Sequence, residues 1–371
     1  MRRYSRAMPW RVIALVALLG AFGLTFGSHF NDLADVAGVL QRGQPGWIVV
    51  ALVLQLLWFL NQAVLYQSIY HLLGLPARTA RLLPTVLASN FLNFVTPSAS
   101  LGAVALFLDD ARQRGLDPSR VALASVVRLV LNLIWFAVLL IFTLTVLVVR
   151  MQLVVEYLVA ASVLLAAGAL VISGLVLAAL RPDLLGQLLG WVGALLDRLR
   201  GALLRRDLFA EDRARRFGMQ FGQAASALWT GRRRLPRPWV HVMLFDALQL
   251  GVLYAMLRAF PGDGAPISPV TLIVVFTLGV LFSVVAVTPQ GLGMVEVTLL
   301  GAFTMVGVPM GRAAIVVLAY RGFTFWTPLL VGLGALRWVR GLGRPYARAA
   351  LDEQPTAGRD DADEEKRWVL D

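Results

Sequence analysis

The chain has 371 residues, of which 58% are hydrophobic and 15% are charged, whereas about 25% of residues are charged in a typical soluble domain. A chain with this composition cannot cover its surface with polar side chains. We therefore expect most of it to lie in lipid. The net charge of +12 comes almost entirely from Arg residues that flank apolar runs, which favours an orientation signal over nucleic-acid binding. There is no Cys, and the three His are far apart, so we expect no disulfide, metal site or cofactor.

Six apolar runs are long enough to cross a bilayer, which takes about 20 residues. In chain order the predicted spans are residues 10–28, 47–73, 119–149, 153–180, 239–260 and 311–336. The first run follows an Arg-rich N-terminus, as the apolar core of a cleaved signal peptide would. No clear small-residue cleavage site follows it, so we interpret it as a retained span.

Two further apolar segments, 82–108 and 268–306, are interrupted near the middle by Pro97 and Pro289. Proline removes a backbone donor and clashes with the preceding turn, so a helix ends there. Residues 82–95 would form a helix of about 21 Å, too short for the ~30 Å hydrocarbon layer. We predict a re-entrant hairpin for the first segment; the first half of the second segment is long enough to span.

The distribution of Arg orients the chain in the membrane. Residues 1–11 contain four Arg, and the loop 181–238 contains twelve Arg against five acidic residues. Because positive residues stay in the cytoplasm, we expect a bacterial-type inner-membrane protein with both termini and this loop inside. Within the loop, leucines at helical spacing over 184–199 predict either an amphipathic helix on the membrane surface or a helix packed on the ends of the spans.

The sequence therefore divides into a transmembrane domain, 1–340, and a tail, 341–371. The tail is acidic and contains Pro and Gly, so it is expected to be disordered in the cytoplasm. Within the domain, two half-repeats are predicted over about 47–180 and 239–340. The fold class is an all-α polytopic membrane protein with about six spans and two Pro/Gly-broken helical hairpins.

The two broken segments repeat the same residues in the same order. The first reads Thr96-Pro97, Leu101-Gly102, Gly115-Leu116, Arg120 and Arg128, and the second reads Thr288-Pro289, Leu292-Gly293, Gly307-Val308, Arg312 and Arg321. The predicted topology enters the first hairpin from the cytoplasm and the second from outside, so the repeats are inverted. Inverted repeats with broken helices are typical of transporters whose site lies between them near the midplane.

The second break carries the most chemical information. Gly291 and Gly293 permit a tight turn and close backbone approach after Pro289, and the helix that follows would point free N–H groups at an anion such as a lipid phosphate. A kink for helix packing is the alternative. Glu296 is expected in an apolar helix, about two turns past the break, where a carboxylate is costly unless it is paired, hydrated or protonated.

Two Arg residues lie deep in predicted spans. Arg128 and Arg321 are each expected about 13–15 Å from the nearer helix start, close to the midplane. Ionisable residues at that depth are candidates for function, and the alternative is a structural Glu–Arg pair that clamps two helices. Asp246 and Arg258 lie nearer the ends of their span, and we expect them to reach the interface.

At these residues the chain resembles the flippase-like family related to the transmembrane region of lysylphosphatidylglycerol synthase. The resemblance rests on Pro289-x-Gly291-x-Gly293-x-x-Glu296, Gly307-Val308 and Arg321, with an echo in Asn93, Pro97, Gly102 and Gly115, and it covers about 10–340. It departs at Ser98-Ala99-Ser100, where glycines are usual, and it lacks the soluble aminoacyl-transfer domain. The resemblance implies a membrane domain that handles lipids, including aminoacylated phospholipids or lipid-linked sugars, without making lysyl-lipid itself.

We therefore expect a lipid translocase or its accessory rather than an enzyme. An anionic head group would be held by Arg321, Arg128 and the half-helix N-termini at the breaks, with Glu296 as counter-charge or proton carrier. The partners expected are membrane lipids and a lipid-modifying enzyme, with no nucleic acid. Two alternatives remain: a membrane-embedded transferase acting on a lipid-linked substrate, and a scaffold for lipid-modifying enzymes that uses loop 181–238 to hold anionic lipid.

Overall fold

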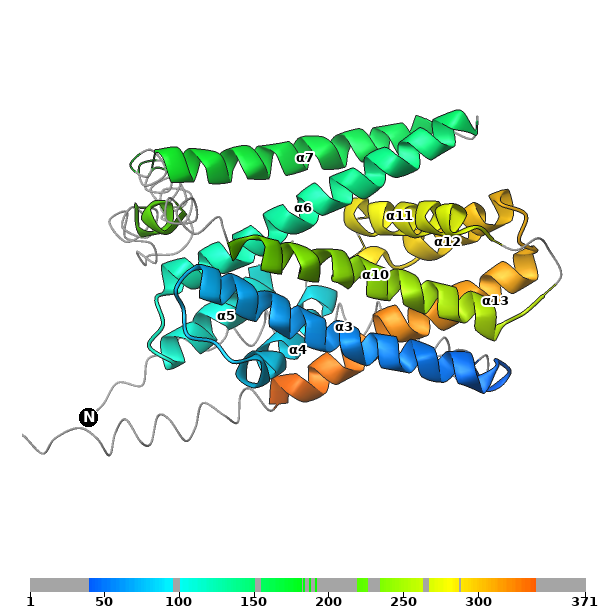
Figure 1. Ribbon diagram of the computed structural model, residues 1–371, viewed down its shortest axis with the longest axis horizontal. Coiled ribbons are helices and arrows are strands. Elements are labelled where there is room, and N and C mark those ends of the chain that lie inside the picture. The colour runs from blue at the N-terminus through cyan, green and yellow to red at the C-terminus, as the bar shows by residue number, and fades with distance from the viewer. Residues whose placement is uncertain are drawn as a thin grey trace, which may run out of the picture.

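The computed structural model describes residues 40–95, 101–150, 155–181, 219–225, 234–262, 267–286 and 288–337, together with the isolated positions 183, 187 and 191. All regular structure in these residues is helical, as predicted (Figure 1). Four predicted features fall outside the described residues: the span 10–28, Pro97 at the first break, the tail 341–371 and, apart from positions 187 and 191, the helix expected over 184–199.

Five helices in the described residues are long and apolar enough to cross a membrane. They are α3 (Pro45–Leu72), α6 (Pro118–Val149), α7 (Val155–Leu180), α10 (Pro236–Ala259) and the continuous run Met310–Arg337, which begins with α13 (Met310–Arg321) and the π-helical turn η3 (Gly322–Trp326). These match five of the six predicted spans. Three of them begin with proline, which is preorganised for the first helical position and gives up an N–H that would be unpaired there.

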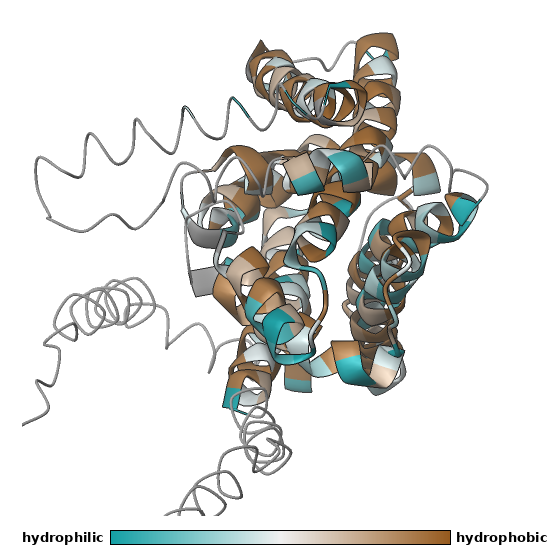
Figure 2. Cartoon of the chain, turned by 90° about the vertical axis from the view of Figure 1, so that its left-hand side faces the viewer, coloured by the Kyte–Doolittle hydropathy of each residue, from teal (hydrophilic) through white to brown (hydrophobic). Residues whose placement is uncertain are grey.

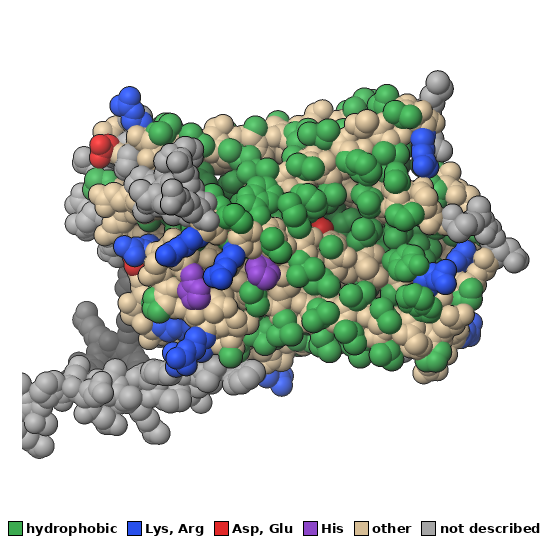
Figure 3. Space-filling model, viewed as in Figure 1, with side chains coloured by type: hydrophobic (Ala, Val, Ile, Leu, Met, Phe, Trp, Pro, Cys, Tyr) green, Lys and Arg blue, Asp and Glu red, His purple; other side chains and the backbone are tan. Residues whose placement is uncertain are grey.

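The outer surfaces of these helices are apolar. Leu56 and Val159 remain more than half exposed, and Figure 3 shows hydrophobic side chains over the middle of one face with Arg side chains towards its two ends. Seen from one end of the bundle, apolar residues make up much of the helices, with hydrophilic residues interspersed (Figure 2). A continuous exposed apolar surface of this extent is stable only against lipid, so the chain is a multi-pass membrane protein.

The two broken segments form helix pairs at opposite ends of the bundle (Figure 1). The first consists of α4 (Thr79–Val95) and α5 (Leu101–Gln113), and the second of α11 (Pro269–Val285) and α12 (Met294–Met305). The 17 residues of α11 extend only about 26 Å. The expectation that this half could span does not hold, because the helix ends at Val285, before Pro289, and by length both members of each pair fall short of the ~30 Å layer.

The second break packs against the first hairpin. The turn η2 (Pro289–Gly291) contacts α4, and α3 packs along α10. A Cβ placed on Gly332 would lie 2.6 Å from the Leu87 carbonyl oxygen, so the second half of the last span lies directly on α4. The two hairpins are thereby brought to a common centre.

The ends of α5 and α12 have the same local structure. Gly115 and Gly307 both adopt the left-handed conformation, with φ of 65° and 84°. After each glycine the next amide donates to the carbonyl five residues back, at 2.9 Å and 3.0 Å. Both half-helices therefore end in the same glycine-based motif, which pairs a carbonyl that would otherwise be left free.

Arg120 and Arg312, which match each other in the sequence repeat, also have matching contacts. The Arg120 guanidinium donates to the Leu73 carbonyl oxygen at 3.5 Å, where α3 ends. Arg312 donates to three carbonyl oxygens where α10 ends, at 2.9–3.3 Å, namely those of Leu257, Phe260 and Gly262. Each Arg thus binds the C-terminus of the first long helix of its own half, where the helix dipole favours a cation.

Candidate functional site

A cavity of about 230 Å³ lies at the centre of the bundle. It is bounded by α3, α4, α6, α10, α11, the second break and the last span. Its walls are apolar at Phe276 and Leu299, but much of its lining is polar. The polar side chains are Trp58, Gln62, Asn90, Asn93, Arg128, Asp246, Gln249, Ser283, Gln290, Tyr320, Arg321 and Thr324. The structure therefore brings together the two deep Arg residues predicted from the sequence.

The second break is a tight turn built from left-handed residues. Gln290, Gly291 and Gly293 have φ of 51°, 68° and 86°. The Thr288 hydroxyl donates to the Leu292 carbonyl oxygen at 2.9 Å and closes the turn. The chain thus reverses between α11 and α12 with its backbone polar groups partly paired inside the protein, as lipid requires.

The two predicted glycines are needed for different reasons. A Cβ on Gly291 would lie 2.7 Å from a Val295 methyl and 2.8 Å from the Ser283 Cα, so this glycine permits the close approach that the sequence predicted. Nothing lies within 4 Å of the corresponding position on Gly293. There the requirement is conformational, since φ of 86° with ψ of −51° is a region that side chains with a Cβ rarely adopt.

Glu296 lies in the first turn of α12, because the helix restarts at Met294, several residues past Pro289. Its Oε2 accepts the Gly293 N–H at 2.7 Å, and its Oε1 accepts the Arg321 Nε–H in a salt bridge. A carboxylate at this position is also favoured by the helix dipole. The Glu296 side chain is therefore an N-terminal cap and the partner of Arg321 at once.

Arg321 is held on several sides. Besides its bond to Glu296, its Nη2 lies 3.5 Å from the Gln290 carbonyl oxygen, and its guanidinium carbon lies 4.8 Å from the centre of the Phe325 ring. Arg321 ends α13, and the π-helical turn that follows brings Phe325 back against it. The salt bridge neutralises the charge of Arg321 and ties the last span to the second break.

Arg128 is placed differently. Its Nη1 donates to the Tyr66 hydroxyl at 3.2 Å, and its guanidinium carbon lies 5.1 Å from the centre of that ring. Its Nε is buried without a hydrogen-bond partner. Across the described residues no carboxylate lies within salt-bridge distance of Arg128. The cavity therefore has one cation neutralised by Glu296 and one that no described carboxylate neutralises.

The cavity also contains buried polar atoms that lack partners in the described structure. The donors are on Trp58, Gln62 and Asn90, and the acceptors are on Asn93 and Gln249. Leaving such an atom unpaired costs about 1–3 kcal/mol, and at membrane depth it is tolerated only where water or a ligand supplies the bond. This lining suits a guest that is polar and carries both acceptors and hydroxyl groups.

The expectation for Asp246 was wrong. It lines the central cavity rather than reaching the interface, because α10 begins at Pro236 and Asp246 falls near the middle of its 24 residues. Arg258 is indeed at the end of α10, with its guanidinium carbon 5.5 Å from the centre of the Trp47 ring. Only Asp246 therefore joins the site.

The first break contributes less to the described site than the sequence suggested. Pro97 lies outside the described residues, and Gly102 lies in the first turn of α5 and is not among the residues that line the cavity. The residues of α4 that line the cavity are Asn90 and Asn93. Within the described ranges, no three His, Asp or Glu side chains come together in a way that could hold a metal ion.

The family model described as the lysylphosphatidylglycerol synthase TM region matches residues 11–332. The chain belongs to this family. The match covers both broken segments and every residue of the central cavity. Membership in the lysylphosphatidylglycerol synthase TM-region family places the protein in lipid modification or transport in a membrane. The comparison with curated proteins gave no match.

Sequence reasoning missed the neutral amides and Asp246, although a signal for them exists. Asn90 and Asn93 are three residues apart, and so are Asp246 and Gln249, within apolar helices. Residues at this spacing share one face of a helix. A pair of polar residues on one face of an otherwise apolar span indicates a face turned to a polar interior rather than to lipid.

Proposed function

We propose that this protein is a flippase-like membrane lipid translocase, or the accessory of one, without catalytic activity of its own. Its cargo would be an anionic phospholipid, an aminoacyl-phospholipid or a lipid-linked sugar, whose head group enters the central cavity. The family and the polar lining of a cavity inside an apolar bundle support a lipid-handling role.

The observation that carries the proposal is the environment of Arg128. A cation at membrane depth without a carboxylate costs several kcal/mol, and an anionic ligand recovers much of that cost. The planar guanidinium can bind two phosphate oxygens at once through parallel N–H groups. The unpaired donors of Gln62 and Asn90 line the same cavity and would complete the binding of a head group.

Arg321 and Glu296 would have a supporting role. Their salt bridge fixes the shape of the break at Pro289, Gly291 and Gly293, and it sets the Arg321 guanidinium against the cavity. The head group would then lie between Arg128 and Arg321, with Asp246 on the third side. Because Glu296 neutralises Arg321, Arg128 is the cation that would meet the phosphate charge.

The arrangement of the hairpins supports movement of the head group across the membrane. With loop 181–238 in the cytoplasm of a bacterial-type inner membrane, α4 and α5 would enter from inside, and α11 and α12 from outside. The matching contacts of Arg120 and Arg312 support two inverted halves of one design. Rocking of one half against the other would open the cavity to each side in turn.

The experiment uses the purified full chain in vesicles of phosphatidylcholine that contain fluorescent phosphatidylglycerol in the outer leaflet. We expect loss of outer-leaflet fluorophore to be accelerated by the wild-type chain and not by Arg128→Gln. Arg78→Gln, which removes an exposed cation outside the cavity, is the matched control. Equal rates for all three proteins and for empty vesicles would contradict a translocase, and a new covalently modified lipid would favour a transferase.

A further inference from the structure

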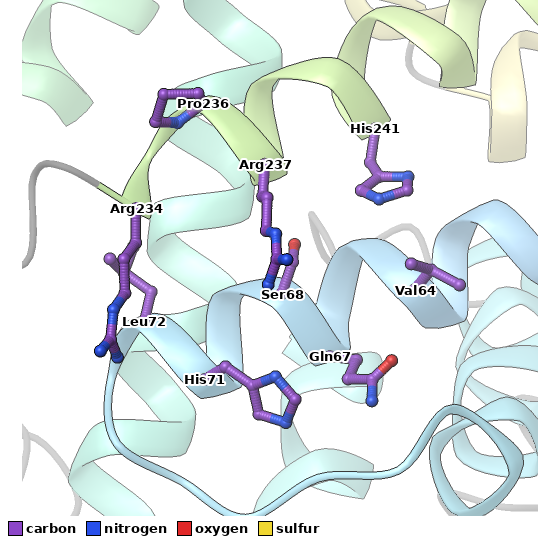
Figure 4. Close-up of a pocket in the computed structure, with 9 residues that line it drawn as sticks. All are labelled: Val64, Gln67, Ser68, His71, Leu72, Arg234, Pro236, Arg237 and His241. Carbon is purple, nitrogen blue, oxygen red and sulfur yellow. The ribbon is translucent and has the colours of Figure 1, made fainter.

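A second cavity, of about 440 Å³, opens at the end of the bundle where α3 finishes and α10 begins (Figure 4). It is lined by Arg234, Arg237, His71 and His241, with Gln67 and Ser68 beside them. No acidic side chain lines it. It shares no residue with the central cavity, so it is a separate site.

The two Arg residues are available for a ligand. Both are exposed, and neither makes a hydrogen bond or salt bridge to any part of the chain that the structure describes. In Figure 4 the Arg237 side chain runs from α10 towards Ser68 on α3, while Arg234 extends past Leu72. Two guanidinium groups on one rim of a cavity offer the paired donors that phosphate oxygens accept.

The two His residues are oriented by the protein. The Nε2 of His71 lies 3.0 Å from the Ala77 carbonyl oxygen, and the Nδ1 of His241 lies 2.8 Å from the Asn61 side-chain oxygen. Both of these oxygens accept, so each of these ring nitrogens carries the hydrogen. The other nitrogen of each ring remains for a ligand, and it becomes a donor when the ring is protonated.

The start of α10 adds to the positive potential of this cavity. Leu235 at the N-cap provides no side-chain cap, and Pro236 and Pro238 carry no N–H. Arg237 is therefore the first-turn residue that still has a free amide. That amide and the positive end of the helix dipole both favour an anion close to the two guanidinium groups.

An apolar surface leads away from the cavity along both helices. Val240 and Leu244 follow Arg237 at helical spacing on α10, and both are at least 40% exposed. On α3, Leu60 lies one turn before Val64 of the cavity wall and is 45% exposed. A ligand with a charged head and acyl chains would match this succession, whereas a soluble anion would leave the apolar surface unused.

We propose that this cavity binds a phosphate group, and that the group is the head-group phosphate of an anionic phospholipid at the membrane surface. A volume of about 440 Å³ lies within the range of small-molecule sites and exceeds what a bare phosphate requires. Two guanidinium groups and one free amide bind the phosphate, each imidazole adds a donor only when it is protonated, and the surface formed by Leu60, Val240 and Leu244 receives the chains.

The test measures binding to the purified full chain in detergent by native mass spectrometry and by thermal shift. The probes are short-chain phosphatidylglycerol, phosphatidylcholine of the same chain length, glycerol phosphate and inorganic phosphate. We expect phosphatidylglycerol to bind best, and the double variant Arg234→Gln/Arg237→Gln to bind one phosphatidylglycerol fewer than the wild type in native mass spectra, because the central cavity is unchanged. Arg78→Gln removes an exposed cation outside this cavity and should bind like the wild type.

The control for folding is the melting temperature without ligand. It should be the same for all variants, because neither Arg234 nor Arg237 has a described partner. Lipid binding that is equal in the double variant and in Arg78→Gln would overturn the site. Binding of glycerol phosphate or inorganic phosphate as tight as that of the lipid would overturn the lipid as the source of the phosphate. Neither result depends on translocation, so the site can fail while the proposed function stands.

Discussion

Arg128 and Arg321 line the same cavity from α6 and α13, yet Arg321 is paired with Glu296, whereas no carboxylate in the described ranges pairs with Arg128. The two residues are counterparts in the sequence repeat, so the asymmetry arises from Glu296, which is present at the second break. One half of the protein therefore contributes a cation neutralised by Glu296, and the other contributes a cation that no described carboxylate neutralises.

Replacement of Arg128 should separate function from stability. Arg128→Gln removes a partly buried charge that lacks a carboxylate, so we expect the melting temperature to stay the same or to rise. In a background of Arg234→Gln/Arg237→Gln, which removes the second cavity's cations, Arg128→Gln should lower phosphatidylglycerol binding roughly tenfold or more. Arg128→Lys should recover only part of it because Lys lacks the planar fork. A variant that binds normally would argue that Arg128 serves only to pack against Tyr66.

Removal of one partner of the Glu296–Arg321 pair should destabilise the fold. We expect Glu296→Gln to lower the free energy of unfolding by about 3–5 kcal/mol, because it leaves the charge of the buried Arg321 uncompensated. Arg321→Met should cost less, because the Glu296 side chain that it leaves unpaired is 34% exposed. The double variant should recover most of that loss. The measurement is thermal unfolding in detergent for the four proteins, and additive losses in the double variant would refute the clamp.

The glycines at the second break should respond to alanine for different reasons. Gly291→Ala forces a Cβ against Val295 and Ser283, and Gly293→Ala strains a positive-φ position in open space, so each should cost about 1–3 kcal/mol. Gly301→Ala lies inside α12 with nothing within 4 Å, and it should be neutral or slightly stabilising. Melting temperatures test this order, and a neutral Gly291→Ala would disprove the close approach.

Arg312 and Arg120, which bind the ends of α10 and α3, should contribute different amounts to the stability of the fold. Arg312→Met removes three hydrogen bonds to carbonyl oxygens, whereas Arg120→Met removes one of 3.5 Å. We therefore expect the free energy of unfolding to fall by about 2 kcal/mol or more for Arg312→Met and by less than about 1 kcal/mol for Arg120→Met. Equal losses for the two variants would show that these hydrogen bonds to carbonyl oxygens do not determine the stability that each Arg contributes.

The topology can be tested with single cysteines, because the natural chain has none. In intact spheroplasts a membrane-impermeant maleimide should label Asp263→Cys but not Arg216→Cys, and permeabilised cells should label both. The expectation rests on the excess of Arg in loop 181–238. Labelling of Arg216→Cys in intact cells would reverse the orientation of both hairpins.

Much of the fold could be predicted from the sequence because lipid imposes simple rules. Apolar runs of about 20 residues predicted α3, α6, α7, α10 and the last span, and Pro97 and Pro289 predicted the two breaks. The Glu296–Arg321 pair could be anticipated as an alternative, since an unpaired carboxylate in an apolar segment is costly. These inferences depend on local composition alone.

The parts that the sequence did not reveal depend on which side of a helix faces inward. Asp246 was expected at the interface because its distance from the ends of the span was judged without the true start of α10 at Pro236. Gln62 carries no charge, so it does not stand out in an apolar run, and only packing shows that it shares a cavity with Gln249. The place of Glu296 in the first turn of α12 likewise follows from Gly293, which delays the restart of the helix.

The most direct test of a head-group site at the centre of the bundle is the rate of phosphatidylglycerol translocation by Arg128→Gln in vesicles. The wild-type chain, Arg78→Gln and the double variant Glu296→Gln/Arg321→Met are measured beside it at equal protein content and after confirmed folding. We predict that Arg128→Gln falls to the rate of empty vesicles, that Arg78→Gln matches the wild type, and that the double variant keeps a measurable part of the rate. A folded Arg128→Gln that moves the lipid as fast as the wild type would contradict the proposal that this cavity binds the head group.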